Sequence, residues 1–170
     1  IDYVSNVVYN WGGNSTYGGE GTTTAGGGRK VNFVGNYYRP GPATKSSVRA
    51  RLCNPTTKCS NCTGKYEGEV VPMQMYLVGN TMDGSEEVTA DNWKGVHPDQ
   101  SEKLDLCRAA AAFSFPNSLL SGEMESASEA LEVVAAKGGC SLLRDAVDMR
   151  IVNDLRNGTG ALIDNPDQVG

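Results

Sequence analysis

The sequence predicts an all-β fold in which short parallel strands stack as the coils of a solenoid, followed by amphipathic helices. One motif recurs three times: a strand-like apolar run, then Val, a small residue and an asparagine. The asparagines are Asn6, Asn36 and Asn80, and repeats separated by a few tens of residues are typical of solenoids. Capping-box patterns followed by helical apolar periodicity appear in the last third of the chain.

Each copy of the motif is predicted to form one strand that ends at a sharp corner. The runs are rich in β-branched and aromatic residues, and a turn rich in Gly or Pro follows each of them. Equivalent residues of neighbouring coils lie about 4.8 Å apart in a parallel solenoid. Stacked asparagines can then pass side-chain amide hydrogen bonds from coil to coil. The alternative is three chance Val-x-Asn turns.

Residues 40–70, between the second and third copies, are predicted to form a long loop that leaves one corner of a coil. They contain the pattern C-x5-C-x2-C, formed by Cys53, Cys59 and Cys62. The pattern favours a disulfide formed in an oxidising compartment. A zinc site, with His97 or Cys107 as a fourth ligand, is the alternative.

Charge is unevenly distributed along the chain. Residues 21–66 hold eight Lys and Arg and no acidic residue, although the whole chain has twenty acidic residues and a net charge of −5. Such a stretch can attract a polyanion, or it can simply be solvated loop surface. We expect no nucleic-acid partner, because the pI is about 4.9 and no nucleic-acid motif is present. We expect no membrane partner, because no apolar run approaches about 20 residues.

Two amphipathic helices are predicted near the end of the chain. Ser126 and Glu129 form a capping-box pattern before an apolar run that Gly138 ends. Asp145 can cap the second helix, and Gly158 can end it. The apolar face of that helix consists of Ala146, Val147, Met149, Ile151, Val152 and Leu155. Helices in this position would cover the flank or the open end of a solenoid.

The predicted organisation is a single domain over residues 1–170. Residues 1–100 form the coils with their cysteine-containing loop, and residues 101–170 form a helical closing segment. The stretch "SEKLDLCRAAAAFSFP" at 101–116 fits either a helix or an extended segment.

Three stretches, "VSNVVYNWGGNSTYGGEG", "VNFVGNYYRPGPATK" and "RDAVDMRIVNDLRNGTGALIDNPDQVG", resemble the C-terminal portion of bacterial pectate lyases. The resemblance runs from Ile1 to Val169. It implies part of a right-handed single-stranded parallel β-helix with the helices packed on it. It also implies an enzyme that is secreted, periplasmic or at the cell surface and cleaves polygalacturonate by β-elimination. In that family a calcium ion neutralises the substrate carboxylate and an arginine removes the adjacent proton.

The reaction centre implied by the resemblance does not fall in this chain. The family's catalytic arginine lies in an R-x-P-R-like motif before the first matching stretch, whereas here Arg39-Pro40 is followed by Gly41 and comes after it. We therefore expect no catalytic residue and no metal ligand in this chain. The Ca²⁺ ligands are expected upstream, in a portion of the same polypeptide that would be a partner of this chain. The isolated chain is expected to be inactive.

The resemblance suggests Tyr17, Glu20 and Arg39 as residues that bind an acidic polysaccharide such as pectin. Arg39 could hold a sugar carboxylate through two hydrogen bonds, and Tyr17 could pack on a sugar ring. Loop or corner structure is the alternative role for each. Lys45, Arg49 and Arg51 could line the mouth of a groove or be solvated.

Two rival functions remain open at this stage. A polygalacturonase-like hydrolase would use acidic residues such as Asp83, in "NTMDG", but it needs a pair of them. A non-catalytic solenoid that only binds acidic glycans is the second rival. Trp11 and Trp93 are expected in the core, and His97 is assigned no catalytic role. Asp145 and Asp148 are expected to cap a helix.

Overall fold

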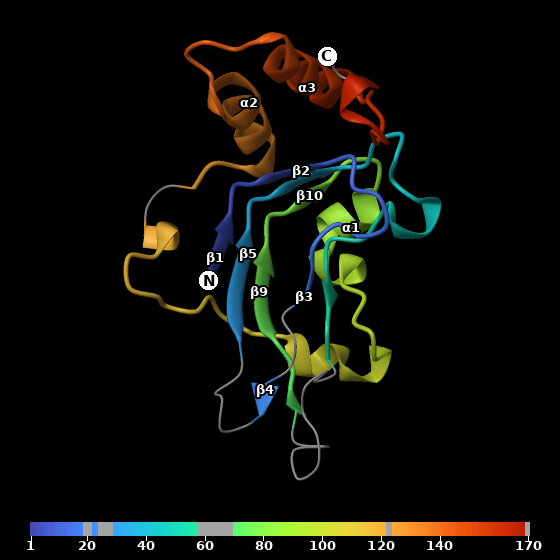
Figure 1. Ribbon diagram of the computed structural model, residues 1–170. Helices are drawn as coiled ribbons and strands as arrows, with labels where there is room; N and C mark the ends of the chain where they lie inside the picture. The colour runs from blue at the N-terminus through green and yellow to red at the C-terminus, as the bar shows by residue number, and fades with distance from the viewer. Residues whose placement is uncertain (19–21, 24–28, 58–69, 122–123, 169–170) are drawn as a thin grey trace.

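A computed structural model describes residues 1–18, 22–23, 29–57, 70–121 and 124–168. Two three-stranded parallel sheets form its centre (Figure 1). The first sheet contains β1 (Asp2–Val4), β5 (Lys30–Val34) and β9 (Gln74–Val78). The second contains β2 (Val7–Tyr9), β6 (Tyr37–Arg39) and β10 (Thr81–Met82). The predicted parallel stacking of the three motif copies is therefore confirmed.

Two shorter pairs complete the strands. A third parallel sheet pairs β3 (Tyr17–Gly18) with β7 (Asn54–Pro55). An antiparallel pair joins β4 (Thr22–Thr23) to β8 (Val70–Val71). Each coil thus contributes one strand to each of the first two sheets, and the first two coils also contribute to the third.

The register of the first sheet is the one that the repeats predict. Tyr3 pairs with Phe33, and Phe33 pairs with Leu77. The small residues that follow this sheet, Ser5, Gly35 and Gly79, have φ values of 52°, 62° and 66°. A left-handed backbone favours glycine, so this corner explains why a small residue recurs before each asparagine.

The corner asparagines form a continuous ladder. The Asn6 side-chain amide donates to Asn36 Oδ1 over 3.0 Å, and that of Asn36 donates to Asn80 Oδ1 over 2.8 Å. Asn36 and Asn80 are almost completely buried. The Asn80 amide in turn donates to Asn92 Oδ1 over 2.9 Å. The predicted ladder is confirmed, and Asn92 adds a rung that the repeats do not predict.

The hydrophobic core consists of two clusters of buried side chains. One includes residues of the first sheet and contains Val31, Phe33, Cys53, Met73, Met75, Val96 and Cys107. The other includes residues of the second sheet and contains Trp11, Tyr38, Val48, Leu52, Met82 and Val88. Trp11 Nε1 donates to Val48 O over 3.1 Å, as expected for a core tryptophan. Trp93 is half-buried against the first cluster.

The end of the stack beyond β9 and β10 is covered by helical turns rather than by another strand coil. These are α1 (Glu86–Ala90) and the 3₁₀ helices Asn92–Gly95 and Ser101–Cys107. The stretch between residue 86 and residue 100, expected as part of the coils, thus contains helical turns, and its Val96 still forms a parallel bridge with Cys53. After Cys107 the chain becomes extended, because Arg108 bridges to Met75. Residues 101–116 therefore combine the two predicted alternatives.

Residues 40–57, the described part of the predicted long loop, are not loop throughout. They include a 3₁₀ helix, Ser46–Val48, and strand β7. Val48, Leu52 and Cys53 are buried in the core clusters. These apolar side chains hold the segment against the coils, which is why it does not project as a loop.

Both predicted C-terminal helices are present. They are α2 (Ala127–Lys137) and α3 (Ala146–Asn157), and each begins with the predicted capping box. Figure 1 shows α2 next to β2 with α3 beyond it. Only Leu155 of the α3 apolar face is buried, and Ile151 is 54% exposed, so most of that face covers nothing here. Two short 3₁₀ helices, Leu119–Ser121 and Pro166–Gln168, complete the elements. None of the described helices has the length and apolarity to cross a membrane.

Candidate functional site

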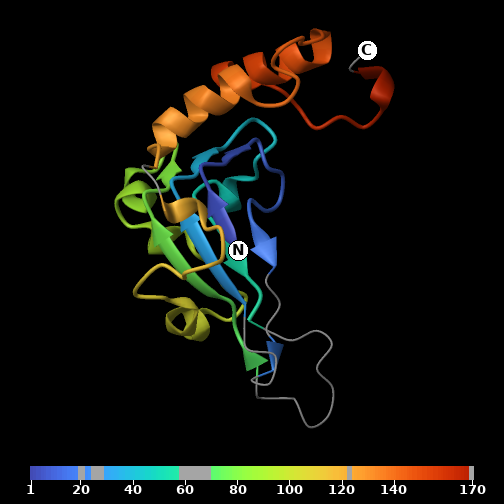
Figure 2. The same ribbon diagram turned by 90° about the vertical axis from the view of Figure 1, so that its left-hand side faces the viewer.

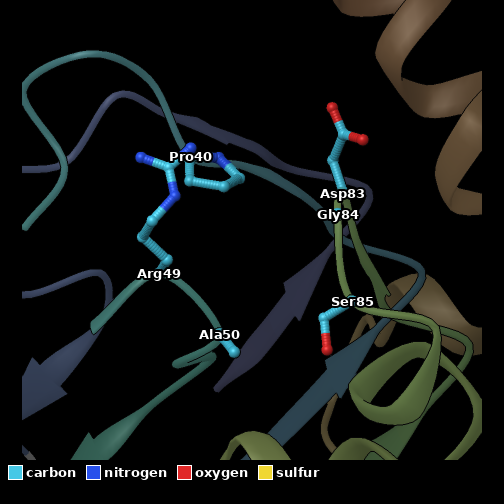
Figure 3. A pocket seen from close by; sticks show the side chains of 6 residues that line it. All are labelled: Pro40, Arg49, Ala50, Asp83, Gly84 and Ser85. Atoms are coloured by element: carbon cyan, nitrogen blue, oxygen red, sulfur yellow. The ribbon is translucent and has the colours of Figure 1, made fainter. Parts of the chain in front are cut away.

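The candidate site is a pocket at the corner where β6 and β10 end (Figure 3). Its volume is about 300 Å³, and it is lined by Pro40, Arg49, Ala50, Asp83, Gly84 and Ser85. A second, more open hollow of about 640 Å³ shares the turn Asp83–Ser85 and adds Tyr37 and Glu86. The turn therefore stands between two depressions on the surface of the coils.

Arg49 is held in place by the turn that follows β6. Its Nη1 donates to Gly41 O over 3.1 Å and to Thr44 O over 3.5 Å. The turn is closed by a hydrogen bond from the Gly41 N–H to Thr44 Oγ1 over 3.0 Å. A Cβ at Gly41 would collide with the side chain of Asn10, so this close approach requires glycine.

Asp83 lies on the other side of the pocket from Arg49 (Figure 3). Arg39 Nε lies 3.3 Å from Asp83 Oδ2. The two side chains are 25% and 40% exposed, so the ion pair contributes at most about 1 kcal/mol. Its main effect is to fix where the Asp83 carboxylate lies. Together, Arg49, Asp83 and Ser85 offer a cation, a carboxylate and a hydroxyl, which can form hydrogen bonds with a polar ligand.

The three candidate binding residues from the sequence do not gather in this pocket. Arg39 lies in the second sheet beneath the end of α3, where a Cβ on Gly158 would lie 3.5 Å from Arg39 Nη2. Tyr17 lies in β3, in a different sheet, and is 73% exposed. Glu20 lies outside the described residues. Arg39 is therefore linked to the pocket by its ion pair with Asp83. Tyr17 lies on another face of the coil.

Of the three cations predicted at a groove mouth, Arg49 lines the pocket. Arg51 donates from Nη1 to Asn14 Oδ1 over 3.3 Å, and its Nε is buried without a hydrogen-bond partner in the described structure. The Lys45 backbone N–H donates to Gly12 O over 3.1 Å. These three residues therefore lie in different surroundings and do not form one group of cations.

The described cysteines do not form the predicted disulfide or zinc site. Cys53 and Cys107 are free and buried, and Cys140 is free and exposed. Burial, with a smaller contribution from the nearby Cys107, raises the pKa of the Cys53 thiol to about 12. Cys59 and Cys62 lie outside the described residues. Cys53 is part of the core because its backbone bridges to Val96 inside the coil.

No group of three candidate metal ligands occurs among the residues that the structure describes. The His97 ring bonds through Nε2 to Lys94 O, 3.2 Å away, so it lies at a turn. Asp145 and Asp148 form the predicted capping box at the start of α3. The described residues thus do not fit a bound calcium ion.

Sequence reasoning missed Ser85 and Asn92. Ser85 caps α1, since its hydroxyl accepts from the Val88 N–H over 3.4 Å. The sequence does contain a helix-start pattern here, because Ser85 is followed by two glutamates and then an apolar residue. Asn92 lies in a 3₁₀ helix and carries no Val-x-Asn motif, so no repeat-based signal could have found it.

The fold and the pocket define a parallel-β protein whose stacked coils carry polar corner pockets. Along its whole length the chain is similar to fungal proteins named "Probable pectate lyase C". It is 29% identical to the one from Aspergillus flavus and 28% identical to the one from Aspergillus oryzae, over 172 aligned positions in each case. Each alignment covers 99% of this chain and 35% of the relative, so the chain spans about a third of the length of these relatives. No model of a known protein family matches the chain.

Proposed function

We propose that the chain is the C-terminal part of a pectate lyase that cleaves acidic polysaccharide, polygalacturonate or pectin, by β-elimination. The similarity to two proteins named pectate lyase C along 99% of the chain carries this proposal. The parallel sheets and the asparagine ladder support it, because they suit a right-handed single-stranded β-helix. The protein acts outside the cytoplasm, where its polymeric substrate is found.

In this proposal the reaction centre lies in the rest of the protein. Removing the proton beside a sugar carboxylate requires neutralisation of that carboxylate, and a calcium ion and arginines supply the positive charge. In the proposal, the calcium ligands and the catalytic arginine lie outside this chain. This chain contributes the scaffold and contacts to the polysaccharide.

The proposed contacts are Tyr17, Glu20 and Arg39, with Arg49 added from the pocket. Arg49 offers a fixed guanidinium group to a uronate carboxylate. The Nε of Arg39 is occupied by Asp83, so a sugar carboxylate would bind its Nη groups. Tyr17, at 73% exposure, presents its ring to solvent, where a sugar can pack on it.

The test compares the isolated 170-residue chain with the longer polypeptide that contains it. Each is incubated with polygalacturonate, with calcium or with a chelator, and unsaturated sugar ends are followed by their ultraviolet absorbance. The proposal predicts a calcium-dependent signal from the longer protein and none from the chain alone. Elimination activity in the isolated chain would contradict the assignment of the reaction centre.

A hydrolase is the second candidate, because Asp83 and Glu86 line one hollow. Glycoside hydrolysis needs such a pair of carboxyl groups. The same assay separates the two, since hydrolysis yields new reducing ends without ultraviolet absorbance. Binding of the polymer without any cleavage would instead support a non-catalytic glycan-binding protein.

A further inference from the structure

The larger of the two hollows lies over the outer face of the second sheet. Its volume of about 640 Å³ falls within the range of about 300–1,000 Å³ that is usual for ligand sites. Tyr38 and Met82 belong to the core, where each is 1% exposed. Because successive side chains of a strand point to opposite faces, Tyr37 and Thr81 lie on the outer face. These two residues are paired in register and form the floor of the hollow.

The turn after β10 and helix α1 form the walls of the hollow. Residues 83–86 of the turn line it, together with Thr89 and Ala90 of α1. Thr89 Oγ1 accepts from the Met82 N–H over 3.0 Å and donates to Met82 O over 3.2 Å. These two hydrogen bonds fix α1 against β10, so the hollow is formed without a ligand. Seen from the side in Figure 2, the helical layer of α2 and α3 lies across one end of the coils, and neither helix lines the hollow.

Tyr37 offers the hollow an aromatic ring and a hydroxyl group. The residue is half-buried, and its hydroxyl has no hydrogen-bond partner among the described residues. Burial, and then the nearby Asp83 carboxylate, raises the pKa of Tyr37, so the hydroxyl stays protonated at neutral pH and can donate. A tyrosine ring can pack on the C–H face of a sugar while its hydroxyl bonds to a polar group.

Two carboxylates supply hydrogen-bond acceptors to the hollow. Arg39 Nε lies 3.3 Å from Asp83 Oδ2, which leaves Asp83 Oδ1 for a ligand. Glu86 is exposed and forms no ion pair or hydrogen bond within the part of the chain that the structure describes. An ionised carboxylate only accepts, and its hydrogen bonds from hydroxyl groups are charge-assisted. The hollow therefore suits a ligand with several hydroxyl donors.

The charge of the hollow disfavours an acidic ligand. Among the described residues that line it, two are acidic and none is Lys or Arg. A uronate carboxylate in the hollow would face Asp83 and Glu86, and like charges repel. A sugar that carries a CH₂OH group in place of the carboxylate avoids this repulsion. The residues therefore favour a neutral sugar.

The neighbouring pocket has the opposite preference. It is lined by Arg49, whose guanidinium is held by two backbone carbonyls. The pocket and the hollow share Asp83, Gly84 and Ser85. Figure 3 shows the side chains of Asp83 and Ser85 pointing to opposite sides of this turn. One turn thus separates a site with a cation from a site with two carboxylates.

From these contacts we propose that the hollow binds a neutral sugar residue, next to a uronate residue in the Arg49 pocket. The sugar packs on the ring of Tyr37, and its hydroxyls donate to Asp83 and Glu86. A polysaccharide that contains both acidic and neutral sugars is then bound more tightly than one made of uronates alone. The uronate in the Arg49 pocket rests on the proposed function, whereas the neutral-sugar site does not.

The test compares two matched disaccharides in nuclear magnetic resonance titrations of the chain, with a calcium chelator present. Galactobiose and digalacturonate of the same linkage share their ring hydroxyls and differ in one group, CH₂OH in the first and a carboxylate in the second. Galactobiose should shift the backbone amide signals of Thr81 and Glu86 in a saturable way. Digalacturonate should leave these signals nearly unchanged.

A variant pair tests the role of the carboxylate. Glu86→Gln keeps the size of the side chain and removes its charge, so it should weaken galactobiose binding by about fivefold or more. Glu102→Gln is the matched control, because Glu102 is an exposed carboxylate in the 3₁₀ helix Ser101–Cys107 and does not line the hollow. This control should bind galactobiose as the unchanged chain does.

Three results would overturn the proposal. The first is a shift of the Thr81 and Glu86 signals by digalacturonate that equals the shift by galactobiose. The second is a galactobiose titration without any saturable shift. The third is cleavage of galactobiose, which would assign the two carboxylates to hydrolysis. Calcium-dependent elimination of polygalacturonate by the longer polypeptide can hold in the first two cases, so failure of this proposal is distinguishable from failure of the proposed function.

Discussion

The side-chain amide of Asn36 donates to the side-chain carbonyl of Asn80 over 2.8 Å, although 44 residues separate the two. Both side chains are nearly completely buried, and each also bonds to backbone groups of a neighbouring coil. Buried amides must be hydrogen-bonded, and here they satisfy one another only when the coils are in register. The ladder thus makes register a condition of stability.

Replacing Asn36 by Ala should destabilise the chain strongly. The change removes the side-chain partner of the Asn6 amides and of the Asn80 carbonyl, in or near the core. Unsatisfied buried polar groups cost about 1–3 kcal/mol each, so we expect a loss of about 3 kcal/mol in the free energy of unfolding. Urea denaturation measures it. Asn153→Ala, on the exposed face of α3, is the matched control and should change stability by less than about 0.5 kcal/mol.

The cysteines should differ sharply in reactivity. Cys140 is exposed, whereas burial raises the pKa of Cys53 to about 12 and also raises the pKa of Cys107. Because the thiolate is the reactive form, an alkylating reagent near pH 8 should label Cys140 in the native protein and reach Cys53 and Cys107 only after unfolding. Peptide mapping by mass spectrometry identifies each site. Native labelling of Cys53 as fast as that of Cys140 would be inconsistent with its place in the core.

Stability in acid should depend on Asp2. Burial raises the pKa of its carboxyl, but hydrogen bonds from Asn32, Ser118 and the Leu119 N–H outweigh this and hold the pKa below its usual value. A carboxyl with a lowered folded pKa stabilises above its unfolded pKa, about 3.9, and this contribution is lost as the pH falls through the folded pKa.

Asp2→Asn should therefore destabilise the protein above about pH 4 and have progressively less effect below it. Urea denaturation at a series of pH values tests this. Asp167→Asn, at an exposed carboxylate in the C-terminal segment, is the control. An Asp2→Asn effect that stays constant from neutral pH to about pH 2 would rule out this role for the carboxylate.

Arg49 should contribute to binding of an acidic oligosaccharide. Its guanidinium lines the pocket and is fixed by two backbone carbonyls. Charge-assisted hydrogen bonds contribute about 1.5–3 kcal/mol, so Arg49→Ala should weaken binding of a galacturonate oligomer by about tenfold or more. Calorimetry with the oligomer measures this. Lys137→Ala removes an exposed cation from α2 and should leave the affinity nearly unchanged.

The repeats predicted the part of the fold that depends on local sequence. Tyr3, Phe33 and Leu77 align as the motif implies, and the small residue before each asparagine adopts the left-handed corner. Helix α2 was predictable because Ser126 and Glu129 form a capping box at fixed spacing. In each case the information lies in a short motif, either repeated in successive coils or with fixed internal spacing.

Features that depend on contacts between distant segments could not be predicted. Asn92 joins the ladder only because α1 turns the chain back over the end of the stack. The sequence predicted Cys53 in a loop. In the structure its backbone pairs with that of Val96, and its side chain is buried in the core. The pocket likewise combines Arg49 with Asp83, and no spacing in the sequence links the two.

The stacking of coils in register is tested most directly by nuclear magnetic resonance of the asparagine side-chain amides. If the coils stack as described, the side-chain NH₂ groups of Asn36 and Asn80 show a mutual nuclear Overhauser effect. Their protons then exchange with solvent only through large-scale unfolding. Fast exchange of both groups without any mutual effect would show that these residues lie apart, and would contradict the account.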